Sequence, residues 1–479
     1  MTGTKEPSLG SAIRWSAINS VVGRVCQVGV SILLARLIAP DQFGLFAVAL
    51  VVLNIVLSVS EMGVSVALIR TPGDVKDIAP TVTTLSFASG TGLALLCVLG
   101  APWFAAELNA PGAAGVIQLM SVALVISGAS AVPGAMLQRD FRQDHKAIAD
   151  LAGFVAGTAV AVVLALTGFG AWSLAWSRIV TNGAAAVVMF VLTKHRYRPG
   201  FDREQAKSLL AFGLPLAGSS LLVFGVLNID YVVVGKLLGP IELAFYLLAF
   251  NLSSWPVGAI SQPVRSVSLA AFSRVRDDRD DPARFRRSFT RALGLLALFT
   301  IPACVLLATF GGPLVRFAYG ERWSAAAAPL ALLVVLGAVR VALELAYDFL
   351  ASAGKARAIL WIHLLWFGSL VPVLAIGAHL GGIRGVAAGH IVVALLLVAP
   401  AYLIALRPFG IRVRALGAAL VRPAVGGVLM ALAGVGAQGL FDTDVWRLVV
   451  GGLAAVAVYA VVVLPMRHEA LRVLRNAAG

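Results

Sequence analysis

Arg24, Arg265 and Arg340 are charged residues within long apolar stretches of this chain. A charged side chain near the centre of a bilayer costs about 2.5 to 3.5 kcal/mol or more, so such a residue usually faces a hydrated cavity. The planar guanidinium carries several N–H donors whose geometry matches the oxygens of a phosphate. These arginines are therefore candidates for binding an anionic group inside the membrane.

Acidic residues at similar depths offer a simpler explanation for two of these arginines. Glu61 lies in the second apolar stretch, near the depth expected for Arg24. Arg340 and Glu344 are spaced i, i+4 and share one helical face. We interpret each of these two Arg/Glu combinations as either a structural ion pair or an ion pair that opens when a ligand binds. Glu61 and Glu344 are therefore candidate gating or charge-pairing residues.

Asp230 stands in the apolar sequence "LNIDYVVVGKLLG", two residues after Asn228. Two interpretations stay open, because an ionisable residue at this depth needs either a ligand or a counter-charge. Asp230 and Asn228 form a site for a coupling cation or proton, or Asp230 pairs with Lys236 or Arg178.

The histidines and cysteines do not indicate a metal centre. His363 and His390 are single histidines in apolar stretches, and we interpret both as packed or hydrogen-bonded groups. Cys26, Cys97 and Cys304 are far apart in sequence and form neither a CxxC motif nor a Cys/His cluster. We expect no metal and no cofactor, apart from Na⁺ or H⁺ as a coupling ion.

The elements that position these residues are membrane helices. The chain of 479 residues is 59% hydrophobic and 13% charged, with a mean hydropathy of +0.92. This leaves too little polar surface for a water-soluble core of that size. Apolar stretches of about 20 residues recur, and each can cross a hydrocarbon core of about 30 Å as a helix. We predict an all-α integral membrane protein with about fourteen spans: 11–38, 43–68, 81–104, 115–137, 147–167, 171–193, 209–238, 242–271, 289–310, 324–350, 358–378, 383–406, 416–438 and 445–465.

The basic residues are distributed unevenly between the two sides of these spans. Segments on the side of the two termini carry 27 Lys and Arg residues, whereas the opposite segments carry six. The positive-inside rule then places both termini in the cytoplasm, with the chain in the cytoplasmic (inner) membrane. The net charge of +15 follows from this topology and from contact with anionic membrane lipids, and we expect no nucleic acid partner.

A repeat joins the two halves of the sequence. "LLARLIAPDQFGLFAVAL" at 33–50 and "VVGKLLGPIELAFYLLAF" at 233–250 align at an offset of 200 residues, with Arg36 opposite Lys236. Each copy reads as the tip of a helical hairpin. The copies lie six spans apart, so they cross the membrane in the same direction and predict parallel repeats. We predict these units: an N-terminal six-helix bundle (1–193), a cytoplasmic linker (194–207), a C-terminal six-helix bundle (208–406), and two extra helices with a cytoplasmic tail (407–479).

Three passages carry a family resemblance: "LLARLIAPDQFGLFAVALVVL" followed by "ALIR", "VPGAMLQRDFRQDHKAIADLAG" at 132–153, and "PVRSVSLAAFSRVRDDRDDPARFRRSFTRAL" at 263–293. They resemble the polysaccharide transporter family of lipid-linked oligosaccharide flippases (Wzx-like), within the multidrug/oligosaccharidyl-lipid/polysaccharide exporter superfamily. The resemblance implies two bundles around a central cavity that opens alternately to each side. It also implies a cargo of polyprenyl-pyrophosphate-linked oligosaccharide or a related envelope polysaccharide precursor. Helices 1 and 8 line the cavity in that superfamily, which favours Arg24 and Arg265.

Two other functions fit this sequence less well than the flippase function. A cation-coupled multidrug exporter of the same superfamily should have more acidic than basic cavity residues, and this sequence has the reverse. A glycan polymerase or ligase should carry a large outer loop with catalytic groups, whereas the outer loops here are short and lack paired carboxylates. No P-loop motif is present. We therefore expect no enzyme activity. Other membrane proteins of glycan assembly are potential partners.

Five tryptophans are predicted at outer helix ends: Trp103, Trp172, Trp176, Trp323 and Trp446. We interpret them as anchors at the membrane interface, with stacking on sugar rings as the alternative.

Overall fold

The computed structural model describes residues 26–60, 68, 75–193, 197–255, 258 and 282–466. Every regular element within these ranges is a helix, and ten helical stretches there are long and apolar enough to cross a membrane. The predicted all-helical membrane class is therefore confirmed. Each of the predicted spans overlaps a described helix.

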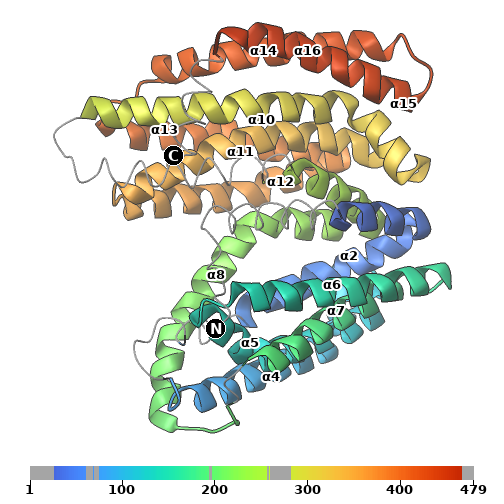
Figure 1. Cartoon of the computed structure of the whole chain (residues 1–479), viewed down its shortest axis with the longest axis vertical. Helices are drawn as coiled ribbons and strands as arrows, with labels where there is room; N and C mark the ends of the chain where they lie inside the picture. The colour runs from blue at the N-terminus through green and yellow to red at the C-terminus, as the bar shows by residue number, and fades with distance from the viewer. Residues whose placement is uncertain are drawn as a thin grey trace, which may run out of the picture.

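The first group of helices occupies the lower part of Figure 1. Helices α4 and α5 cross where an added Cβ on Gly128 would lie 2.4 Å from the Ser86 carbonyl oxygen. Helices α6 and α7 cross in the same way, because a Cβ on Gly153 would lie 2.4 Å from the Thr181 carbonyl oxygen. Small residues thus let these membrane helices approach closely. The group comprises the helix Cys26–Leu37, α2 (Pro40–Ser60), α4 (Ala79–Glu107), α5 (Ala114–Arg139), α6 (Gln143–Leu166) and α7 (Ala171–Leu192).

The second group contains a sharp reversal inside α12. Gly381 and Gly382 are non-helical, and Gly382 has a φ of 57°, which an L side chain rarely adopts. The chain then folds back on itself, and an added Cβ on Gly385 would lie 1.8 Å from the Gly377 carbonyl oxygen. The boundary predicted between the spans 358–378 and 383–406 is confirmed. The group comprises α8 (Arg203–Leu238), the helix of residues 240–255, α10 (Pro282–Tyr319), α11 (Ala327–Ser352), α12 (Ala356–Val393) and α13 (Ala399–Leu406).

Helix α8 connects the two groups and crosses between them in Figure 1. It begins at Arg203, six residues before the predicted span, because the Asp202 side chain accepts a hydrogen bond from the Gln205 amide at 3.0 Å and caps the helix. The preceding segment is fixed to α4, where the Thr84 hydroxyl donates to the Gly200 carbonyl at 2.6 Å. Farther along, α8 packs on α2 and α12. The unit boundaries drawn around 194–207 stay a prediction.

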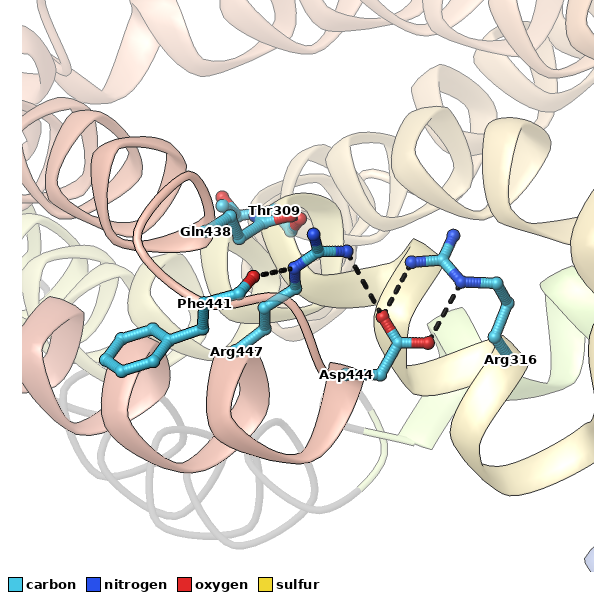
Figure 2. A network of polar contacts seen from close by, with 6 residues as sticks. All are labelled: Thr309, Arg316, Gln438, Phe441, Asp444 and Arg447. Atoms are coloured by element: carbon cyan, nitrogen blue, oxygen red, sulfur yellow. Dashed lines mark hydrogen bonds and ion pairs between the residues drawn. The ribbon is translucent and has the colours of Figure 1, made fainter.

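Two extra helical stretches pack on the outer face of α10, at the top of Figure 1. Figure 2 shows the polar contacts that attach them: Arg316 donates to the Asp444 carboxylate from Nε at 3.0 Å and from Nη2 at 2.8 Å. Gln438 Nε2 donates to the Thr309 carbonyl at 2.9 Å. The stretches are α14 (Val413–Gln438) and the run of α15 (Asp444–Trp446), a π turn (Arg447–Gly451) and α16 (Gly452–Val463).

The molecule has two ends along its helices. The tip end contains Pro40 and Pro240, which mark the two hairpin tips of the repeat. The linker end is the opposite end and contains residues 197–202.

Candidate functional site

The predicted site residues divide into two sets. Arg24, Glu61 and Arg265 lie outside the described residues. The other four lie on two helices of the second group: Asp230 and Asn228 on α8, and Arg340 and Glu344 on α11.

The two hairpin tips of the repeat meet at the tip end. Gly44 of α2 approaches the backbone so closely that an added Cβ would lie 2.4 Å from the Pro240 carbonyl oxygen. Nearby, Trp323 Nε1 donates to the Ala35 carbonyl at 2.8 Å. The first and second groups are therefore in direct contact at this end.

Matching basic residues of the repeat make reciprocal contacts around the tips. Arg36 of the first group donates from Nε to the Ala318 carbonyl near the end of α10, at 2.7 Å. Lys236 of the second group lies 2.7 Å from the Glu107 carboxylate at the end of α4. Each of these residues thus binds the opposite group. Together with the Gly44 contact, these bonds close the tip end.

Trp323 is a structural residue of this closure and not an interfacial anchor. Its side chain is fully buried, and its ring lies 5.3 Å from the ring of Phe43 and 5.8 Å from that of Phe245. One phenylalanine comes from each hairpin tip. The prediction for Trp323 is therefore wrong, whereas Trp103, at 62% exposure, has the open surface that an anchor requires.

Asp230 forms a buried polar cluster in the second group. It has 0% exposure, and its Oδ2 accepts a hydrogen bond from the Tyr246 hydroxyl at 3.0 Å. His390 Nε2 lies 3.4 Å from the same oxygen. The other carboxylate oxygen, Oδ1, is buried and has no hydrogen-bond partner among the residues that the structure describes. Such a group can hold a shared proton between the carboxylate and the imidazole, or offer Oδ1 to a cation.

Neither counter-charge considered for Asp230 contacts it. Lys236 binds Glu107, and the buried Nε of Arg178 on α7 has no hydrogen-bond partner within the described ranges. The actual neighbour, His390, comes from α12, whose position beside α8 the sequence does not reveal. The interpretation of His390 as a packed, hydrogen-bonded histidine missed its contact with a carboxylate.

Arg340 faces this cluster from α11. Its positive charge is near enough to interact electrostatically with the hydroxyls of Tyr231 and Tyr246. Tyr246 is the hydrogen-bond donor to Asp230. Among the described residues, no hydrogen bond or ion pair involves the Arg340 guanidinium, so the intrahelical pair with Glu344 is not formed. Arg340 is therefore a cation within a membrane helix whose charge lacks a direct acidic partner in this part of the chain.

A row of aromatic rings continues from Arg340 toward the linker end. Tyr347 lies seven residues later on α11, and its ring is 5.6 Å from that of His363 on α12 at an angle of 74°. The His363 ring is 6.2 Å from that of Trp366. Tyr347 is 39% exposed, so one end of the row is open.

Residues 33–328 match the profile of a family described as "Polysaccharide biosynthesis protein". The chain belongs to this family. The match includes both hairpin tips, Asp230 and Trp323.

Two curated relatives are similar to this chain over most of its length. Lipopolysaccharide biosynthesis protein WzxC of Escherichia coli (strain K12) is 25% identical over 408 residues, which cover 83% of this chain and 81% of that protein. Succinoglycan biosynthesis transport protein ExoT of Rhizobium meliloti (strain 1021) is 24% identical over 348 residues, 72% of this chain and 69% of that protein.

Solved structures confirm the fold of this family member. A structure of the lipid II flippase MurJ in an inward closed conformation has a TM-score of 0.78 at 14% identity, covering 95% of this chain and 99% of that one. An inward-facing multidrug resistance MATE transporter of the MOP superfamily has a TM-score of 0.62 at 16% identity, covering 80% and 94%. The chain therefore shares the fold of these two transporters.

Proposed function

We propose that this protein is a flippase that carries a polyprenyl-pyrophosphate-linked oligosaccharide, or a related envelope polysaccharide precursor, across the cytoplasmic membrane. Its membership of a polysaccharide biosynthesis family and its similarity to polysaccharide and lipopolysaccharide biosynthesis proteins support this proposal. The closed tip end gives the alternating mechanism a starting state, in which the cargo enters from the linker end.

The observation that carries the proposal is the Arg340 guanidinium in a membrane helix, without a direct acidic partner among the described residues. An unpaired charge there costs about 2.5 to 3.5 kcal/mol or more. A pyrophosphate brings both negative charge and oxygens that fit the guanidinium fork. Binding the head group therefore offsets a cost that the empty protein bears.

Arg24 and Arg265 complete this anion site in the proposal, because the resemblance places helices 1 and 8 at the cavity. Glu61 then serves as the charge partner that holds Arg24 in the empty state and releases it when the cargo binds. This exchange keeps the cavity charge balanced through the cycle. Glu344 is the gating residue one turn from Arg340 on α11, without an ion pair to it in this structure.

We propose Asp230 as the coupling residue, with Asn228 nearby on α8. Its buried carboxylate has one free oxygen, and it lies beside His390 and Tyr246. Uptake of Na⁺ or H⁺ would neutralise the carboxylate and change its attraction to Arg340. The same ion would thereby change the anion affinity of the cavity.

A cation-coupled multidrug exporter is the second candidate, because the MATE transporter shares the fold. That function requires a cavity that attracts organic cations, and Arg340 disfavours it. A polymerase or ligase is less favoured, since the relatives with assigned roles include a transport protein. The flippase and the multidrug exporter carry different cargoes, so a direct transport assay distinguishes these two functions.

The unit boundaries and orientation belong to the same proposal. Units 1–193 and 208–406 move relative to each other about the linker 194–207, and 407–479 stays attached to the second unit through α10. Both termini and the linker end face the cytoplasm, as the distribution of basic residues indicates.

Deletion of the chromosomal copy tests the proposal. Lipid-linked saccharide should accumulate in the cytoplasmic leaflet and disappear after complementation with the wild-type chain. Complementation with Arg340→Ala at equal membrane abundance should leave the accumulation in place. A deletion strain with normal lipid-linked saccharide in both leaflets would contradict the proposed function.

A further inference from the structure

The indole nitrogen of Trp366 is a buried donor that has no hydrogen-bond partner in the described part of the chain. A buried tryptophan N–H normally finds an acceptor, because leaving one unsatisfied destabilises the fold. Trp323 shows the usual arrangement in the same chain, because its Nε1 donates to the Ala35 carbonyl at 2.8 Å. The orphaned donor of Trp366 therefore indicates a missing acceptor.

His363 supplies the complementary group one turn earlier on α12. Its Nδ1 lies 2.9 Å from the Ile359 carbonyl oxygen. Because a carbonyl only accepts, Nδ1 carries the hydrogen, and in the neutral ring Nε2 is then an acceptor. The two rings are 6.2 Å apart. A ligand that contacts both side chains must accept from an indole N–H, donate to an imidazole nitrogen, and present an apolar face to aromatic rings.

We propose that Tyr347, His363 and Trp366 form a subsite for one sugar ring of the cargo. A pyranose fits these demands, since its hydroxyls both donate and accept and its C–H face packs on aromatic rings. The inference rests on the proposed function and adds the group that recognises the saccharide. Arg340 lies seven residues from Tyr347 on the same face of α11, a rise of about 10 Å. A pyrophosphate at Arg340 thus places the first sugar near the aromatic row.

Trp366→Phe tests the subsite, because phenylalanine keeps an aromatic ring and removes the donor. The full chain is placed in lipid nanodiscs, and binding is measured for polyprenyl pyrophosphate and for polyprenyl pyrophosphate carrying a single glucose. We expect unchanged affinity for the sugar-free lipid and at least fivefold weaker binding of the glucose-bearing lipid, since a ligand hydroxyl loses its partner. His363→Phe should have the same selective effect.

Thermal unfolding separates binding from a structural role. Trp366→Phe removes an unsatisfied buried donor, so its Tm should equal or exceed that of the wild type. The control Trp323→Phe breaks a formed bond and should lower Tm. A Trp366→Phe variant with a lowered Tm and unchanged selectivity would overturn the subsite, as would unchanged binding of both lipids, which is expected if water alone occupies the site.

The comparison also distinguishes this inference from the proposed function. A wild-type chain that binds both lipids equally well would overturn the sugar subsite and leave the flippase assignment intact. A wild-type chain that binds neither lipid would contradict both.

Discussion

Replacing Gly44 by alanine is expected to push the two hairpin tips apart. The new Cβ would lie 2.4 Å from the carbonyl oxygen of Pro240 and 2.6 Å from its carbonyl carbon, both backbone atoms. Ordinary contact begins at 3.4 Å, so the tips must separate by about 1.0 Å (3.4 minus 2.4). Overpacking of this kind costs about 1 to 3 kcal/mol. That cost falls on the closed state alone and shifts the ratio of closed to open tips by roughly 5- to 150-fold.

The shift can be measured as a distance distribution between spin labels on the two tips. Asp41→Cys and Ile241→Cys place one label beside each tip proline, in a background without Cys26, Cys97 and Cys304. We expect the longer-distance population to grow when Gly44→Ala is added. Transport should fall because the closed-tip state is part of the cycle.

Gly112→Ala is the matched control at the same end of the molecule. Its added Cβ would meet only the Leu45 side chain at 3.6 Å, an ordinary contact. This variant should keep the wild-type distances and activity. If Gly44→Ala and Gly112→Ala gave the same distances, the direct contact of the tips would be refuted.

The remaining predictions concern charge and topology. Arg340→Ala should abolish transport in a fold of normal Tm, and Arg340→Lys should restore only part of it, because lysine lacks the guanidinium fork; full activity of Arg340→Ala would exclude it from the anion site. Asp230→Asn keeps an oxygen for its hydroxyl donor but cannot ionise, so transport in vesicles with an imposed Na⁺ or proton gradient should no longer respond to the gradient. Asp444→Asn weakens the charge-assisted bonds of Figure 2 and should destabilise the protein by about 1 kcal/mol, seen as a lower Tm with transport retained. Lys355→Cys should react with an impermeant thiol reagent only from the cytoplasmic side and Glu321→Cys only from outside; the reverse pattern would overturn the orientation.

The sequence predicts the helices of this protein well because the bilayer sets their length. Every predicted span overlaps a helix, and a helix begins at both Pro40 and Pro240, which the sequence alignment places opposite each other. Helix ends are less predictable, since local groups set them: α8 begins where Asp202 caps it, and α10 extends beyond the predicted 289–310 at both ends.

Contacts between helices could not be predicted, and the site consists of such contacts. Asp230 and His390 are 160 residues apart (390 minus 230), and no local pattern links them. In a soluble helix the apolar stripe marks the buried face, but in lipid both faces are apolar, so this signal is lost. The same loss explains why the sequence predicts Trp323 at the membrane interface although the side chain is fully buried.

Transport by the purified protein in liposomes tests the central claim most directly. Polyprenyl-pyrophosphate-linked oligosaccharide is placed in both leaflets, and its accessibility to an added, impermeant sugar-modifying enzyme is followed over time. The account predicts that the wild-type chain brings the inner-leaflet pool to the enzyme and that Arg340→Ala does not. Liposomes in which the lipid-linked saccharide stays in its leaflet, while an organic cation is transported, would contradict the account.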